Sequence, residues 1–86
     1  MTDESYRRCL PPGVGDLLRD ARLRRGWSLR QAANYIGVSP GHLCNLEHGR
    51  RAPRVWLVER LVHQLRLSSA EAGALLAHAA PDGEWS

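Results

Sequence analysis

The sequence predicts an all-α fold, a compact bundle of five short helices, and two kinds of observation support this prediction. Apolar residues recur at intervals of three and four in five separate segments, which places their side chains on one face of a helix. Serine, proline and glycine stand at the ends of these segments, where helix caps and stops are expected. The sequence lacks the apolar–polar alternation typical of strands, so we predict no sheet.

The 86 residues suffice for one small domain, which we predict to span residues 13–80. Residues 1–12 are predicted to be a flexible N-terminal tail, and residues 81–86 a C-terminal tail. No segment has the apolar centre of a secretory leader, or the roughly 18 apolar residues needed to cross a bilayer. With two cysteines, Cys9 and Cys44, we expect free thiols in a cytoplasmic protein and no contact with a membrane.

The first two predicted helices occupy residues 14–25 and 28–36. Gly26 ends the first helix, and Ser28 begins the second as an N-cap, with Gln31 completing a capping box. Each helix has one apolar face: Leu17, Leu18 and Ala21 on the first, and Leu29, Ala32, Ala33 and Ile36 on the second.

Three further helices follow after short connections. The third begins at Ser39, with Pro40 at a position where a missing N–H costs no hydrogen bond, and ends near Gly49. The fourth spans residues 54–65, and the fifth begins at Ser68 with another capping box. Their apolar faces are Val55, Val58, Leu61, Val62 and Leu65 on the fourth helix, and Ala72, Leu75, Leu76 and Ala79 on the fifth.

The charge of the chain is concentrated in its centre. All twelve basic residues are arginines, and residues 13–66 hold ten of them against four acidic residues. Arginine offers a planar fork of donors that binds phosphate or guanine through two hydrogen bonds. A domain with this charge is expected to bind a polyanion.

The second and third predicted helices are joined by a three-residue turn, so they must cross steeply. Ala33 is small enough for a close crossing, and Gly37 lets the chain enter the turn with a positive φ. The apolar residues that would anchor the third helix are Val38, Leu43 and Leu46. The opposite side of residues 39–48 would then be free to enter a groove of nucleic acid.

These residues resemble the lambda-repressor-like helix-turn-helix family, also called the Xre or Cro/C1 type. The matching positions are Arg22, Gly26, Trp27, Ser28, Ala33, Gly37, Val38, Ser39, Leu43, Leu46, Glu47, Gly49, Pro53, Leu61, Leu65 and Ser68. The resemblance implies a transcriptional regulator, most simply a bacterial or phage repressor, that binds double-stranded DNA. It would place residues 39–48 in the major groove and act as a homodimer on an inverted repeat.

The resemblance also implies roles for individual residues. Arg22 and Glu47 match an ion pair with a structural role, and Trp27 matches a core position. The expected base-contacting residues are Ser39, Pro40, Gly41, His42 and Asn45, among which Asn45 can pair with adenine. The expected phosphate-contacting residues are Ser28, Arg50, Arg51 and Arg54.

The sequence leaves other interpretations of some residues open. Trp56 can lie at the core rim or in an interface, and Leu75 and Leu76 can extend the core or form a dimer contact. A protein-binding adaptor, such as an antitoxin or anti-repressor, is therefore the alternative function. Cys44 and His48 share a helix face without a second pair of ligands, so we expect no metal, no cofactor and no enzymatic activity.

Overall fold

A computed structural model describes residues 10, 11 and 13–80 of the chain. This part contains five α-helices, α1 (Val14–Arg24), α2 (Leu29–Ile36), α3 (Pro40–Glu47), α4 (Val55–Leu65) and α5 (Ser69–Ala77). Among the described residues no strand forms, and one isolated bridge joins Arg54 to Ala80. The predicted all-α class is confirmed. The predicted C-terminal tail, Cys9 and most of the predicted N-terminal tail lie outside the described residues.

Local capping rules set the ends of the helices. The Ser28 hydroxyl accepts a hydrogen bond from the Gln31 amide at 3.1 Å, and the Gln31 side chain accepts one from the Ser28 amide at 2.8 Å. The same reciprocal pair forms at the start of α5, with Ser68 as N-cap. Gly37 ends α2 at a φ of 94°, the left-handed conformation that the turn into α3 requires.

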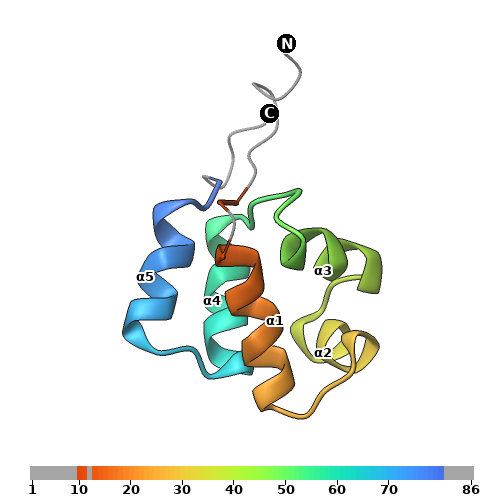
Figure 1. The fold of residues 1–86 in the computed structure, drawn as a ribbon. Helices are drawn as coiled ribbons and strands as arrows, with labels where there is room; N and C mark the ends of the chain where they lie inside the picture. Colours follow the sequence, from red (N-terminus) through yellow and green to blue (C-terminus); the bar gives the residue numbers. More distant parts are fainter. Residues whose placement is uncertain (1–9, 12, 81–86) are drawn as a thin grey trace.

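The helices surround one apolar core. In Figure 1, α1 crosses in front of α4, with α5 on one side of this pair and α2 and α3 on the other. The α3 helix packs against both α1 and α2. The core is formed by Leu10, Leu18, Ala21, Ala32, Ala33, Ile36, Leu43, Leu46, Leu57, Val58, Leu61, Leu65, Leu67 and Leu75. A core shared by all five helices holds α3 as a rigid element.

Two core residues correct the sequence prediction. The tail predicted for residues 1–12 is wrong at Leu10, which is 5% exposed and whose amide donates to the Gly49 carbonyl at 3.1 Å. Leu57 is 1% exposed, although the predicted apolar stripe of α4 omits it. Leu10 lies outside every helix and is buried against a segment distant in sequence, which helical periodicity cannot reveal. Leu57 lies one and two turns before Leu61 and Leu65, so it belongs to the same apolar face as they do.

Gly15 permits the close approach of α1 to α3. A Cβ atom at this position would collide with the backbone carbonyl of Glu47 and would lie 3.0 Å from the Leu46 carbonyl oxygen. Backbone atoms cannot move aside as a flexible side chain can. The glycine therefore sets the distance at which α3 is held against α1.

Candidate nucleic-acid interface

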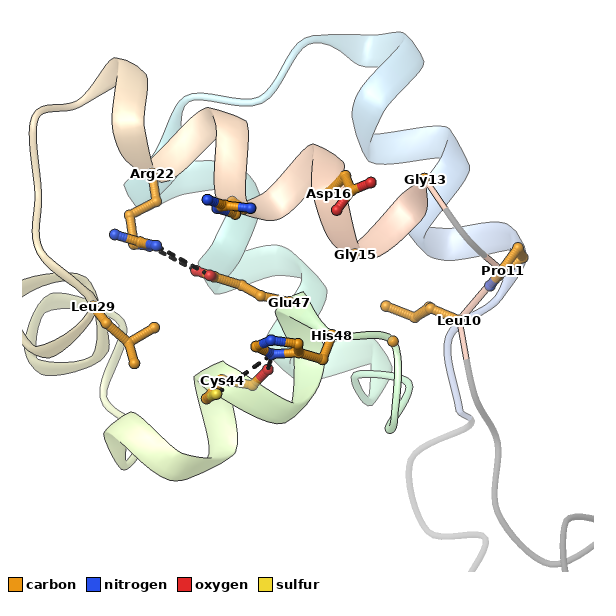
Figure 2. A pocket seen from close by; sticks show the side chains of 12 residues that line it. Leu10, Pro11, Gly13, Gly15, Asp16, Arg22, Leu29, Cys44, Glu47 and His48 are labelled. Carbon is orange, nitrogen blue, oxygen red and sulfur yellow. Dashed lines mark hydrogen bonds and ion pairs between the residues drawn. The ribbon is translucent and has the colours of Figure 1, made fainter.

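The inner side of α3 is held by a bidentate ion pair. Arg22 Nε donates to Glu47 Oε2 at 2.7 Å, and Arg22 Nη2 donates to Glu47 Oε1 at 3.1 Å (Figure 2). The side chains are only 12% and 5% exposed, so solvent screens the pair weakly. Arg22 Nη1 also donates to the Trp27 carbonyl at 3.0 Å, which ties the loop before α2 to the same pair.

The outer side of α3 begins with its N-terminal turn. Ser39, Pro40 and Gly41 are exposed, and His42 is half-buried. The Ser39 hydroxyl oxygen accepts from the His42 amide at 3.1 Å, and Pro40 occupies the first turn. Because the Ser39 oxygen caps the helix, its hydroxyl proton is the group that remains to donate outward.

Burial holds the pKa of His42 below its ordinary value, and the positive charge of Arg51 lowers this pKa further, by a smaller amount. His42 is therefore neutral at pH 7, where its ring carries one donor and one acceptor.

Asn45 lies one turn further along the outer side and is half-buried. Arg50 contacts it twice: the Arg50 amide donates to the Asn45 carbonyl at 2.9 Å, and Arg50 Nη1 donates to Asn45 Oδ1 at 3.2 Å. The structure thus joins two residues with different predicted roles: Asn45 was expected to contact bases, and Arg50 was expected to contact phosphates.

The other predicted phosphate contacts flank this surface. Arg51 is exposed in the loop after α3, and Arg54 is the half-buried N-cap of α4. At Ser28 both the amide and the hydroxyl oxygen are engaged in the capping box with Gln31. A phosphate at the start of α2 would therefore meet the Ser28 hydroxyl proton and the neighbouring amides, and not the Ser28 amide itself.

A groove between α1 and α3 includes Cys44 and His48 on its α3 wall (Figure 2). Cys44 is a free thiol, and its Sγ lies 3.4 Å from His48 Nδ1. That ring nitrogen is 2.9 Å from the Cys44 carbonyl oxygen, an acceptor, so Nδ1 carries the proton. Within residues 10, 11 and 13–80, no group of three or more metal-ligating side chains is present.

An aromatic cluster between the loop before α2 and the last turn of that helix was not predicted. The Trp27 and Tyr35 rings stack with centroids 4.5 Å apart, and the Arg25 guanidinium lies 4.4 Å above the Trp27 ring. Trp27 is half-buried and packs against the core, so its predicted core position is in fact at the core rim. The isolated tyrosine gave no signal, because its partner belongs to a loop eight residues earlier.

Arg60 is another contact that the sequence pattern does not reveal. Its Nη1 donates at 2.8 Å to the carbonyl of Ile36, the last residue of α2. The guanidinium lies 5.9 Å from the Trp56 ring centroid on the same helix. Arg60 thus connects α4 to the point where the chain turns toward α3.

The residues predicted as a candidate interface divide into two kinds. Trp56 is 46% exposed and Leu76 is 50% exposed, so both present apolar area to solvent. Leu75 is fully buried, so of the two alternatives left open for it the structure favours the core. It faces inward because it lies on the side of α5 that packs against α4 and α1.

The described helices are all too short or too polar to span a membrane. Residues 14–75 match the model of a protein family described as a helix-turn-helix domain. The chain therefore belongs to the helix-turn-helix family, and the membership predicted from its sequence is confirmed.

Two relatives are transcriptional regulators. The chain is 39% identical over 54 residues, 63% of its length, to the transcriptional regulator ClgR of two Mycobacterium tuberculosis strains. It spans about half of these curated relatives, 48% of their length. The crystal structure of the clp gene regulator ClgR from C. glutamicum superimposes with a TM-score of 0.64 at 34% identity. This match covers 78% of the present chain and 87% of that chain. Neither relative favours the adaptor alternative.

Proposed function

We propose that the chain is the DNA-binding part of a transcriptional regulator and binds double-stranded DNA with the outer side of α3 in the major groove. One observation carries this proposal. The helix is fixed by buried groups on one side, whereas its other side presents short polar residues, of which Asn45 is hydrogen-bonded to Arg50 of the arginine-rich loop that follows. A rigid helix beside cationic groups is the arrangement by which helix-turn-helix proteins read base edges.

Base contacts are assigned to the outer side of α3. Asn45 and His42 supply side-chain donors and acceptors, and Ser39 supplies its hydroxyl proton. Pro40 offers its ring to a thymine methyl group, and Gly41 lets the DNA approach the backbone closely. Few of these groups are long, so DNA shape is expected to contribute to sequence choice.

Phosphate contacts are assigned to Arg51, Arg54 and the start of α2 at Ser28. Arg51 is exposed in the loop before Pro53, and Arg54 is the N-cap of α4, next to the amides that begin this helix. Arginine forks and helix N-termini both bind phosphate oxygens well. These contacts would set the register of the protein on DNA without choosing the sequence.

A single α3 contacts few base pairs, so we propose a homodimer that binds an inverted repeat with half-sites about 34 Å apart. Leu76 and Trp56 are the exposed apolar residues offered as its interface. Acting on chromosomal DNA would place the protein in the cytoplasm.

Titration of the purified chain against a pool of random DNA duplexes, at several salt concentrations, tests the proposal. The logarithm of the binding constant should fall against the logarithm of salt with a slope of about −0.9 per phosphate contacted. The Arg51→Ala variant should lose about one unit of this slope. Arg24→Ala is the matched control, because Arg24 pairs with Glu71 of α5 and should leave the slope unchanged. Binding that ignores salt, or no binding to any duplex, would contradict the proposal.

A further inference from the structure

The contact between Arg50 and Asn45 determines which end of the Asn45 amide faces outward. A guanidinium only donates hydrogen bonds, so the amide atom 3.2 Å from Arg50 Nη1 must be the oxygen. The Asn45 Nδ2 group then points away from Arg50. Without such a partner, an asparagine side chain can turn over and exchange the positions of its oxygen and nitrogen.

The backbone keeps Arg50 in reach of Asn45. The Arg50 amide donates to the Asn45 carbonyl at 2.9 Å, and the preceding Gly49 amide donates to the Leu46 carbonyl at 3.1 Å. These bonds close the C-terminal end of α3 and fix the Cα atom of Arg50 relative to the last turn. Only the Arg50 side chain has to be ordered for the contact to form, which lowers its entropic cost.

We propose that Arg50 is a positioning residue that sets sequence specificity by holding Asn45 with its NH₂ group toward the DNA. This inference rests on the proposed function and deepens it. The NH₂ group donates to N7 of adenine or guanine, to O6 of guanine and to O4 of thymine. Cytosine presents only a donor in the major groove, so the fixed amide rejects it. Adenine stays compatible with two bonds, because Oδ1 keeps one lone pair beside Arg50.

This role differs from the phosphate contact that the sequence assigns to Arg50. A phosphate contact strengthens binding to every sequence alike, whereas a positioning residue changes the order of preference among bases. Arg51, the adjacent residue in the same exposed loop, serves as the matched comparison, since it has the same charge.

The test uses the DNA sequence that the wild type selects, made in four versions that differ only in the base that Asn45 faces. Affinities for these four duplexes should be measured for the wild type, Arg50→Ala, Asn45→Ala and the double variant. Arg50→Ala should reduce discrimination against cytosine on the order of tenfold, which is about 1.4 kcal/mol. In the Asn45→Ala background the same substitution should have no such effect. Arg50→Lys, which keeps a donor, should restore part of the discrimination.

The inference is overturned if Arg50→Ala weakens binding to all four duplexes equally, both in the wild type and in the Asn45→Ala background. In that case the slope of the binding constant against salt should also fall by about one unit. Arg50 would then be a phosphate contact, and the proposed function would stand. The proposed function itself fails, and this inference with it, if the wild type binds no duplex. Thermal melting of Arg50→Ala should match the wild type, because the side chain is exposed.

Discussion

The two sides of α3 follow different physical rules. On the inner side Leu43 and Leu46 are almost fully buried, and Glu47 is 8% exposed and bonded twice to Arg22. On the outer side Ser39, Pro40 and Gly41 are exposed, and Asn45 is oriented by one exposed arginine. Substitutions on the inner side should therefore act on the free energy of unfolding. Those on the proposed DNA-reading side should act on binding and leave stability nearly unchanged.

The largest expected effect is that of Glu47→Ala. Removal of the carboxylate leaves the Arg22 guanidinium, whose side chain is 12% exposed, without its main partner. Breaking a buried pair in this way costs about 3–5 kcal/mol, a large share of the stability of a small domain. Urea unfolding measures the loss. Arg24→Ala, which breaks an exposed ion pair with Glu71, should cost less than about 1 kcal/mol. Equal midpoints for the wild type and Glu47→Ala would refute a structural role for the pair.

Gly15→Ala should come next. Alanine is the better helix former, but its Cβ would meet the Glu47 carbonyl and push α3 away from α1. Overpacking of this kind costs typically about 1–3 kcal/mol. Gly73→Ala is the control, because Gly73 lies inside α5 with nothing within 4 Å of an added Cβ. That variant should gain up to about 1 kcal/mol. If both variants gained stability, the close contact between α1 and α3 would be disproved.

Arg60→Ala should have a smaller effect. It removes the 2.8 Å bond to the Ile36 carbonyl at the end of α2. A bond with a charged donor contributes about 1.5–3 kcal/mol, and because Arg60 is exposed we expect a loss at the lower end. Thermal unfolding measures this loss of stability. Arg66→Lys serves as the control, because it also replaces an exposed arginine. A melting temperature unchanged from the wild type would show that water replaces this contact.

The smallest effect concerns pH. Because burial lowers the pKa of His42, the unfolded chain holds more protons between that lowered pKa and the ordinary value of 6.5. The free energy of unfolding should therefore fall as pH decreases from 7 through this window. His42→Gln should make the fall shallower, as measured by urea unfolding at a series of pH values. Identical pH dependence in the two proteins would contradict the burial of this ring.

Local signals account for the parts of the fold that sequence predicted well. The caps at Ser28 and Ser68 and the left-handed Gly37 depend on residues within four positions, and all three appear as expected. Contacts between distant elements were missed, including Leu10 against Gly49 and Arg60 on Ile36. Leu75 was left undecided between core and interface, because both sides of α5 carry apolar residues and only the packed structure separates them.

The candidate site divides in the same way. The positions of Ser39 and Pro40 follow from helix capping, so their exposure was predictable. The orientation of Asn45 was not, because it depends on a side chain from the loop that follows α3. Residue type and spacing indicate which groups can reach DNA, but hydrogen bonds within the protein determine which atoms those groups present.

The most direct test of the division of α3 is selection of bound sequences from a random DNA pool, run in parallel with the wild type, Asn45→Ala and Gly15→Ala. The selection should be done at a temperature where circular dichroism shows all three folded. We expect Asn45→Ala to change the preferred base at one position of each half-site, and Gly15→Ala to select the wild-type sequence with lower yield. The same selected sequence for the wild type and Asn45→Ala, or no enrichment by the wild type, would contradict this expectation.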